Sequence, residues 1–224
     1  MTLLRPRGVL FDLDGTLIDT APEFIHIAGL LRAEAKLPPG DEQTIWHSVS
    51  HGAIGMVAAA LDISASEPGF EHWRQRFLDH YATSLGTFSA PYPGIRELLS
   101  SLQSHGVAWG VVTNKLARFA QPLMTKMAFT PAAGVIVTPD DVSHPKPDPE
   151  SLVLACKTLQ CPPANTIFVG DHRRDIEAGV AAGCKTIAAS YGYLAMGESA
   201  EEWGADAIAS SSQELRTIIE ELLA

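Results

Sequence analysis

The sequence is poor in cysteine and in basic residues, and it has no long hydrophobic run. Its three cysteines, Cys156, Cys161 and Cys184, are odd in number, and their spacing matches no zinc motif. We therefore expect reduced thiols in a cytoplasmic protein, with Cys156 and Cys184 packed in the interior. No apolar stretch approaches the length of a membrane span, so we do not expect a membrane-spanning protein.

Basic residues are outnumbered by acidic ones: 16 lysines and arginines stand against 26 aspartates and glutamates, and the formal net charge is −10. Nucleic acids and anionic membrane surfaces attract proteins that carry basic patches, so we expect neither as a partner. The 224 residues, 46% of them hydrophobic, are enough for one large domain or two small ones with a real core. The sequence does not indicate an oligomeric state.

Short apolar runs alternate with helical patterns over most of the chain. Nearly continuous apolar runs are typical of strands that are buried on both faces of a sheet. We predict strands at 8–13, 107–113, 133–138, 166–170 and 185–190, and a weaker edge strand at 205–209. Helices are predicted at 95–105, 148–159, 173–183 and 211–224. This alternation predicts an α/β fold, a doubly wound, Rossmann-like parallel sheet.

Residues 20–90 contain no convincing strand and have a helical period instead. Thr20 and Glu23 have the spacing of a capping box, so a helix is predicted to begin at Thr20. Further helices are predicted at 45–61 and 71–85. We therefore expect a small α-helical cap domain at 20–90, inserted into a core domain formed by 1–19 and 91–224. The two borders are plausible hinges.

The first predicted strand ends in two carboxylates, Asp12 and Asp14, and buried carboxylates are costly unless a cation or hydrogen-bond donors compensate them. An EF-hand loop would also use Asp12 and Asp14, with Glu23 as its last ligand. That reading is disfavoured because Leu17 stands where the loop requires glycine, and because a strand precedes the loop. An ordinary acidic turn is a second alternative.

Polar residues also follow the other predicted strands. Thr113 and Asn114 end the second strand, Lys146 stands between two prolines, and Asp171 ends a later strand with Asp175 four residues further on. Each has a structural explanation on its own, as a helix cap or a surface charge. Because the carboxyl ends of parallel strands share one sheet edge, we expect all of them to converge with Asp12 and Asp14 on one site.

These four segments resemble the signature motifs of the haloacid dehalogenase superfamily of phosphohydrolases, and the resemblance covers the whole chain, including the inserted cap. The segments "DLDGTLIDT", "VVTNK" and "KPDP" are similar to the phosphoglycolate phosphatase branch. More narrowly, "GVVTNK", "HPKPDPE", "LACKTL" and "YGY" are similar to a subgroup of sugar-phosphate phosphatases that includes N-acetylmuramic acid 6-phosphate phosphatases of cell-wall recycling.

The resemblance implies a Mg²⁺-dependent phosphatase that acts through an aspartyl-phosphate. Asp12 would be the nucleophile. Asp14 would protonate the leaving group and then activate water, and its backbone carbonyl would bind the metal. Asp171 would hold Mg²⁺ together with Asp12, because this ion prefers carboxylate oxygens.

The same resemblance assigns the remaining motif residues. Thr113 and Lys146 would bind the phosphoryl oxygens, with Asn114 nearby. Asp175 would orient Lys146 or a metal-bound water, and Gly15 would let the backbone turn toward the phosphate.

Two positions depart from the family pattern, and several activities remain open. His172 stands where many relatives have an acid or a serine, and Leu116 stands where close relatives often have proline. Asp14 disfavours a dehalogenase, which needs no acid at this position. Lys36 is the only cap lysine, which disfavours a phosphonoacetaldehyde hydrolase. A sugar-phosphate mutase and a catalytically silent binding module stay as alternatives.

The substrate is expected to be a small organic phosphate, either phosphoglycolate or a sugar phosphate such as N-acetylmuramic acid 6-phosphate. The polar cap segment with Ser50, His51 and Gly52 is a candidate for contacting its non-phosphate end, although a simple turn between helices explains it equally well. Three cap arginines could bind a carboxylate of such a substrate or could be surface charges: Arg32, Arg74 and Arg76.

Overall fold

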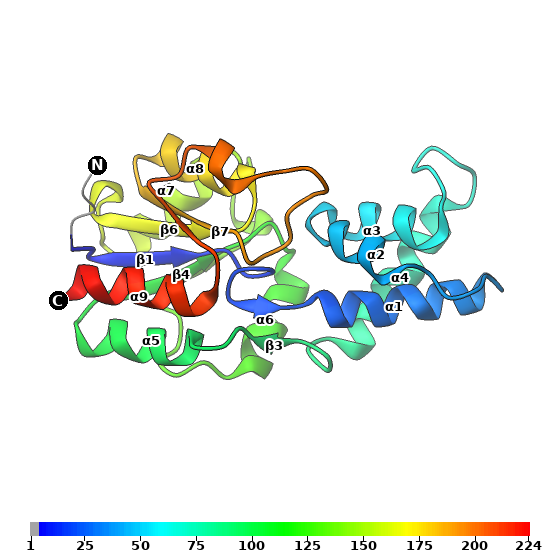
Figure 1. Ribbon diagram of the computed structural model, residues 1–224, viewed down its shortest axis with the longest axis horizontal. Coiled ribbons are helices and arrows are strands. Elements are labelled where there is room, and N and C mark those ends of the chain that lie inside the picture. The colour runs from blue at the N-terminus through cyan, green and yellow to red at the C-terminus, as the bar shows by residue number, and fades with distance from the viewer. Residues whose placement is uncertain (1–4) are drawn as a thin grey trace.

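The protein, in a computed structural model that describes residues 5–224, is built on a six-stranded parallel sheet (Figure 1). The strand order is β5-β4-β1-β6-β7-β8, so the first strand lies in the middle of the sheet and β8 lies at an edge. The strands are β1 (Gly8–Phe11), β4 (Ala108–Val112), β5 (Ile136–Val137), β6 (Thr166–Gly170), β7 (Lys185–Ala189) and β8 (Ala207–Ala209). The predicted α/β fold with a parallel sheet is confirmed.

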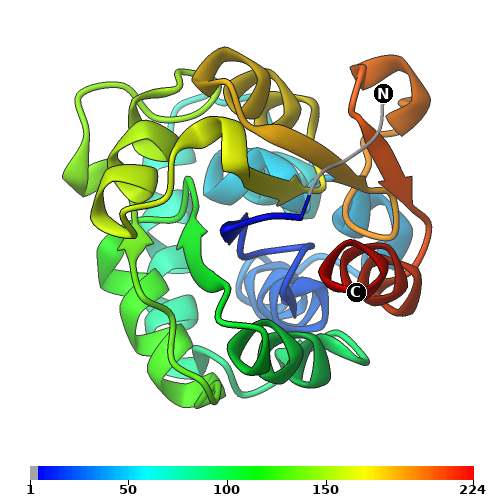
Figure 2. The same cartoon turned by 90° about the vertical axis from the view of Figure 1, so that its left-hand side faces the viewer.

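Helices cover both faces of the sheet, because successive strand residues point to opposite sides. Val9 and Phe11 of β1 pack in one hydrophobic cluster, whereas Leu10 between them belongs to another. The first cluster includes α5 (Ile95–Ser104), α6 (Ala117–Met127) and α9 (Ser212–Leu223). The second includes α7 (Glu150–Thr158) and α8 (Arg173–Ala182). Figure 2 shows these two helical layers on either side of the strands.

A separate group of helices lies beyond one end of the sheet (Figure 1). It consists of α1 (Ala21–Glu34), α2 (Glu42–His47), the short 3-10 helix η1 (Val49–His51), α3 (Gly52–Leu61) and α4 (Phe70–Ser84). The chain enters this group through β2 (Ile18–Asp19) and leaves it through β3 (Ala90–Pro91), and these two short strands pair with each other. We call residues 20–90 the cap; its status as a separate domain remains a prediction.

The interior of the cap is a hydrophobic cluster that the core completes. Phe24 of α1 packs against Phe77 and Tyr81 of α4, with ring centroids 5.9 and 5.0 Å apart. Phe119 and Tyr193, which belong to the core, pack in the same cluster. The cap therefore rests on the core through aromatic side chains.

Three predictions about local structure were wrong or incomplete. The predicted helix at 45–61 is divided among α2, η1 and α3. Helix α6 was not predicted, and it carries Pro122 inside it. The capping box at Thr20 is absent, because the Thr20 side chain does not cap α1 and instead donates a hydrogen bond to Asp14 (2.8 Å).

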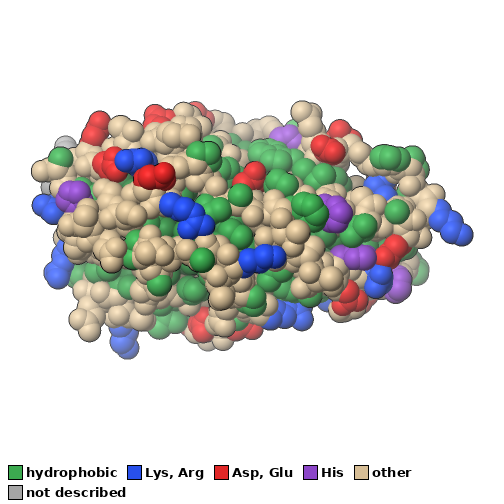
Figure 3. Space-filling view, turned by 90° about the horizontal axis from the view of Figure 1, so that it is seen from below, with side chains coloured by type: hydrophobic (Ala, Val, Ile, Leu, Met, Phe, Trp, Pro, Cys, Tyr) green, Lys and Arg blue, Asp and Glu red, His purple; other side chains and the backbone are tan. Residues whose placement is uncertain are grey.

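The surface carries charges of both signs. On the face shown in Figure 3, lysine and arginine side chains are scattered among acidic ones and form no continuous patch. Within residues 5–224, no helix combines the length and the apolar character that crossing a membrane requires. The three cysteines are buried and not in disulfides, which confirms the packing expected for Cys156 and Cys184.

Candidate active site

The predicted site residues meet at one cavity at the carboxyl edge of the sheet, beneath the cap. Its volume is about 360 Å³. All seven motif residues of the core line it, namely Asp12, Asp14, Thr113, Asn114, Lys146, Asp171 and Asp175. The cap residues Ser50, His51 and Gly52 line the same cavity. The expected convergence of separate strand ends is therefore present in the structure.

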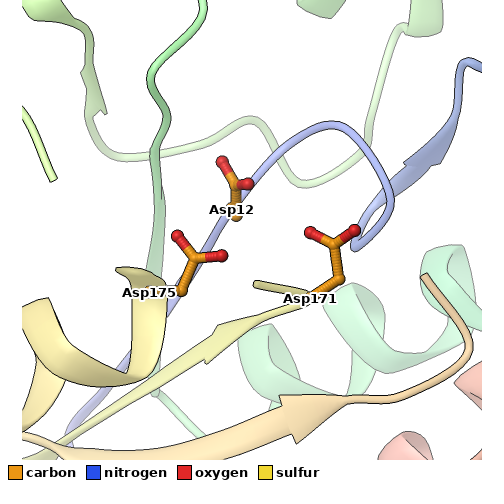
Figure 4. Close-up of side chains that lie close together, drawn as sticks. All are labelled: Asp12, Asp171 and Asp175. Carbon is orange, nitrogen blue, oxygen red and sulfur yellow. The ribbon is translucent and has the colours of Figure 1, made fainter. Parts of the chain in front are cut away.

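Three carboxylates crowd together on the floor of the cavity (Figure 4). Asp12, Asp171 and Asp175 each offer an oxygen, and these oxygens lie within 4.8 Å of one another. Burial, together with the negative charges of Asp12 and Asp175, raises the pKa of Asp171 well above its ordinary value. Such a cluster of hard oxygen ligands fits a divalent cation, which would compensate the excess negative charge.

Lys146 is the one ammonium that contacts this cluster among the described residues. Its Nζ lies 3.0 Å from Asp12 Oδ1 and 2.7 Å from Asp175 Oδ1, and it donates to the carbonyl of Val112 (2.8 Å). Although burial by itself lowers the pKa of Lys146, the two carboxylates outweigh this effect and raise it. The Asn114 amide donates to the Lys146 carbonyl (2.9 Å) and so helps to fix this loop.

Asp171 is held in place by its surroundings. The backbone N–H of Tyr193 donates to its Oδ2 (2.8 Å). Two glycines leave room for the carboxylate: a Cβ at Gly15 would lie 2.0 Å from Asp171 Oδ2, and one at Gly192 would lie 2.2 Å from Asp171 Cβ. Gly15 also has a φ of 79°, which favours glycine. The loops around Gly15 and Gly192 are therefore shaped around this carboxylate.

Asp14 lies apart from the three carboxylates and has a different cation. The ammonium of Lys115 lies 2.9 Å from both of its oxygens. Burial by itself lowers the pKa of Lys115, but the Asp14 carboxylate outweighs this effect and raises it. Sequence reasoning assigned Lys115 no role, although it follows Thr113 and Asn114 directly in the second motif.

His172 and Asp175 together cap helix α8. The Nδ1 of His172 accepts a hydrogen bond from Arg174 N (3.1 Å), and Asp175 Oδ2 accepts one from His172 N (3.0 Å). Burial lowers the pKa of His172 to about 4, so its ring is neutral near pH 7. At the position where many relatives carry an acid or a serine, this chain thus uses a neutral helix cap.

The EF-hand alternative is excluded by the position of Glu23. This fully buried carboxylate accepts hydrogen bonds from Gly86 N (2.7 Å), Thr87 N (3.3 Å) and Ser89 Oγ (2.5 Å). It ties the start of α1 to the segment that leaves α4, and it is not part of the carboxylate cluster.

The cap touches the core through the Ser50 segment. Ser50 Oγ donates to the carbonyl of Tyr193 (2.6 Å), and Arg174 donates to the carbonyl of Ser50 (2.8 Å). His47 Nδ1 lies 3.0 Å from the carbonyl of Leu194. In this arrangement the polar groups of Ser50 bind the core, while substrate contact by His51 and Gly52 remains a prediction.

Most of the cap cations considered from the sequence lie elsewhere. Arg32 donates to the carbonyls of Pro38 and Ala60, Arg76 pairs with Glu34, and Lys36 is exposed. None of Arg32, Arg76 and Lys36 lines the cavity.

Arg74 does line the cavity. It is paired with Glu71 through a contact of 2.6 Å. It is thus the one cap arginine of the three that reaches the site, and its charge is already matched.

The chain is similar to known phosphatases along its whole length. A family model for haloacid dehalogenase-like hydrolases matches residues 9–189. The chain is 47% identical to an N-acetylmuramic acid 6-phosphate phosphatase of Pseudomonas aeruginosa, over 100% of this chain and 99% of the relative. It is 32% identical to a phosphoglycolate phosphatase of Xylella fastidiosa, over 91% of this chain and 88% of the relative.

A solved structure shares the whole architecture. The crystal structure of a predicted phosphoglycolate phosphatase from Haemophilus somnus superposes with a TM-score of 0.83 at 26% identity, covering 97% of this chain and 99% of that one. The predicted superfamily and the predicted phosphatase class are both confirmed by these relatives. The chain belongs to the haloacid dehalogenase-like hydrolase family.

Proposed function

We propose that this chain is a Mg²⁺-dependent phosphatase whose substrate is N-acetylmuramic acid 6-phosphate. The observation that carries the chemistry is the cluster of Asp12, Asp171 and Asp175 around Lys146, at the floor of a cavity that the cap covers. The substrate is inferred from the Pseudomonas aeruginosa relative, which is similar along its full length.

In the proposed mechanism, Asp12 attacks the phosphorus of the bound ester. A bond forms between a carboxylate oxygen of Asp12 and phosphorus, and the bond from phosphorus to the sugar oxygen breaks. Lys146, 3.0 Å from Asp12, orients the nucleophile and offers positive charge to the phosphoryl group. Thr113, which is buried directly after the neighbouring strand β4, is placed to bind a phosphoryl oxygen.

Asp14 acts first as the general acid and then as the general base. It gives a proton to the departing sugar oxygen, and it then takes one from the water that attacks the aspartyl-phosphate. The hydrolysis releases inorganic phosphate and restores the Asp12 carboxylate. Lys115 and Thr20 fix the position of Asp14, because both donate hydrogen bonds to it.

Asp12, Asp171 and the backbone carbonyl of Asp14 would hold the metal. When bound, Mg²⁺ supplies positive charge that offsets the carboxylates and the phosphate dianion. Asp175 keeps Lys146 in place through their 2.7 Å contact. We further propose that residues 20–90 act as a cap domain that selects the substrate while the core carries the chemistry.

The test is the release of inorganic phosphate from a panel of esters in the presence of Mg²⁺. The panel contains N-acetylmuramic acid 6-phosphate, 2-phosphoglycolate, N-acetylglucosamine 6-phosphate and glucose 6-phosphate. We expect the highest kcat/KM with N-acetylmuramic acid 6-phosphate. Isomerised sugar phosphate without free phosphate would indicate a mutase instead, and the absence of turnover with every ester would refute the proposal.

A further inference from the structure

The hydroxyl of Tyr81 is a buried donor that lacks an acceptor. Tyr81 lies on α4, is 3% exposed, and borders the cavity that contains Asp12. No described residue accepts a hydrogen bond from its hydroxyl, and the polar group next to its oxygen is the Lys115 ammonium, which can only donate. Leaving a buried polar group without a partner is energetically costly. At the wall of a binding cavity, a hydroxyl without an acceptor indicates that a ligand atom accepts its hydrogen bond.

Lys115 lies directly beside this hydroxyl. Its Nζ is 4.7 Å from the centroid of the Tyr81 ring and 5.2 Å from that of Phe24, so the ammonium lies among aromatic side chains of the cap. Its side chain is 7% exposed and lines the cavity. An ammonium can only donate hydrogen bonds, so Lys115 cannot accept the proton of the Tyr81 hydroxyl. Burial raises the pKa of Tyr81, which keeps that proton in place.

Two donors therefore meet at the cap side of the cavity: the Lys115 ammonium, which also binds Asp14, and the Tyr81 hydroxyl, whose proton has no acceptor. The group that suits the unpaired proton beside an ammonium is a negatively charged acceptor. An ionised carboxylate is such a group, because it accepts through two oxygens and donates nothing. Arg118 and Arg174 also line the cavity, and the contact that Arg174 makes there is a hydrogen bond to the Ser50 carbonyl rather than to a carboxylate.

We propose that Tyr81 and Lys115 form a subsite for a carboxylate of the substrate, which makes the enzyme selective for phosphate esters that carry a carboxylate. The inference rests on the proposed function, and it gives a chemical reason for it. N-acetylmuramic acid 6-phosphate and 2-phosphoglycolate both carry this group, whereas N-acetylglucosamine 6-phosphate lacks it. In this proposal the substrate carboxylate is bound by Lys115 of the core and Tyr81 of the cap, and not by the cap arginines.

The test compares two substrates that differ only in the lactyl ether: N-acetylmuramic acid 6-phosphate and N-acetylglucosamine 6-phosphate. The measured quantity is the ratio of their kcat/KM values in the wild type, in Tyr81→Phe and in Tyr92→Phe. Tyr92 is a matched control, because it lies outside the cavity lining. We expect Tyr81→Phe to lower the ratio about tenfold, mainly through KM, since a hydrogen bond to a charged group is lost. Tyr92→Phe should leave the ratio at its wild-type value.

A ratio in Tyr81→Phe equal to that of the wild type would overturn the subsite. Lys115→Met is the second variant, and it too should lower the ratio, whatever its effect on turnover through Asp14. Inhibition provides a readout that is independent of the sugar phosphates. N-acetylmuramic acid should inhibit the hydrolysis of p-nitrophenyl phosphate better than N-acetylglucosamine does, and Tyr81→Phe should reduce that difference.

Failure of the subsite and failure of the proposed substrate can be told apart. If the wild type does not hydrolyse N-acetylmuramic acid 6-phosphate, the proposed substrate is wrong, and the comparison is repeated with 2-phosphoglycolate against 2-hydroxyethyl phosphate. A selective loss in Tyr81→Phe with this second pair would still support the subsite. An equal loss with both esters, or no hydrolysis of 2-phosphoglycolate, would overturn it.

Discussion

At the scale of single residues, the site separates two carboxylates that are only two positions apart in the chain. Asp12 is paired with Lys146, whereas Asp14 is paired with Lys115. Each aspartate thus has its own ammonium, and the two can carry different roles in one reaction. The sequence could predict the aspartates and Lys146 from their places at strand ends. It could not predict Lys115 as a partner of Asp14, because a shared sheet edge brings the motifs together without showing which of their side chains pair.

The role of Asp12 can be tested by removing its charge while keeping its shape. We expect Asp12→Asn to lower kcat by at least about a thousandfold, because an amide cannot form the aspartyl-phosphate. Phosphate release from p-nitrophenyl phosphate measures the effect, and circular dichroism checks that the variant is folded. Residual activity above a few per cent of the wild type would refute Asp12 as the nucleophile.

At the scale of secondary-structure elements, the predictions succeeded where the apolar pattern was continuous. Strands β1, β6 and β7 were predicted from nearly continuous apolar runs, and the structure shows that their residues are buried on both faces of the sheet. Helix α6 was missed because its Pro122 interrupts an otherwise helical pattern. The supposed capping box failed because tertiary contacts recruited both side chains: Thr20 binds Asp14, and Glu23 binds the end of the cap. Local spacing does not reveal such competition.

The N-terminus of α1 is capped mainly by a side chain from the core, together with Asp19, whose Oδ1 accepts a longer hydrogen bond from Ala21 N (3.2 Å). The Tyr193 hydroxyl accepts hydrogen bonds from Thr20 N (2.6 Å) and Ala21 N (2.9 Å), and it donates to Asp19 Oδ1 (2.8 Å). We expect Tyr193→Phe to lower the free energy of unfolding by about 1–2 kcal/mol, as the loss of a helix cap does. Urea unfolding measures this, with Tyr191→Phe as a control that removes a single hydrogen bond to Thr16. Equal stability of Tyr193→Phe and wild type would contradict this capping role.

An ion pair between α1 and α4 should make stability depend on pH. The Arg76 guanidinium hydrogen-bonds to Glu34 and lowers the pKa of that carboxyl to about 2. Because the pKa of Glu34 is lower in the folded than in the unfolded protein, the ion pair stabilises the folded state above about pH 4.5. This stabilisation is lost as the pH falls toward 2. Solvent screening at this partly exposed pair keeps its contribution to stability small.

Urea unfolding of wild type and Glu34→Gln at two pH values measures this contribution. The difference in free energy between the two proteins should be larger at pH 7 than at pH 3. A difference that stays constant over this range would contradict the assignment to Glu34.

At the scale of the whole molecule, the sheet supplies the chemistry and the cap supplies the enclosure. The strand order places β1 between β4 and β6, so the ends of all three strands, with the motif residues that follow them, reach one cavity. This part of the site could be predicted from the sequence, because parallel strands have one shared carboxyl edge. The cap side could not, since helical packing alone decides that Tyr81 of α4 lies over Lys115.

Binding of Mg²⁺ should stabilise the whole protein. The metal would bind the folded carboxylate cluster and not the unfolded chain, so Tm should rise with Mg²⁺ concentration. At a hundred times Kd, bound Mg²⁺ should raise the free energy of unfolding by about 2.7 kcal/mol. Asp171→Asn should abolish this rise. Because burial and neighbouring carboxylates raise the pKa of Asp171, its ionised form destabilises the metal-free protein, and the variant should start from a higher Tm. An equal Mg²⁺ response in both proteins would contradict the proposed ligand.

The pairing of β2 with β3 has a consequence for how such enzymes diversify. Ile18 lies opposite Pro91 and Asp19 opposite Ala90, so the chain departs for the cap and returns at neighbouring points, about 5 Å apart. Because the two ends of the cap lie next to each other, the length and shape of the cap can change without moving β1 or β4. Evolution can therefore exchange the selective part as a module while it inherits the hydrolytic machinery unaltered.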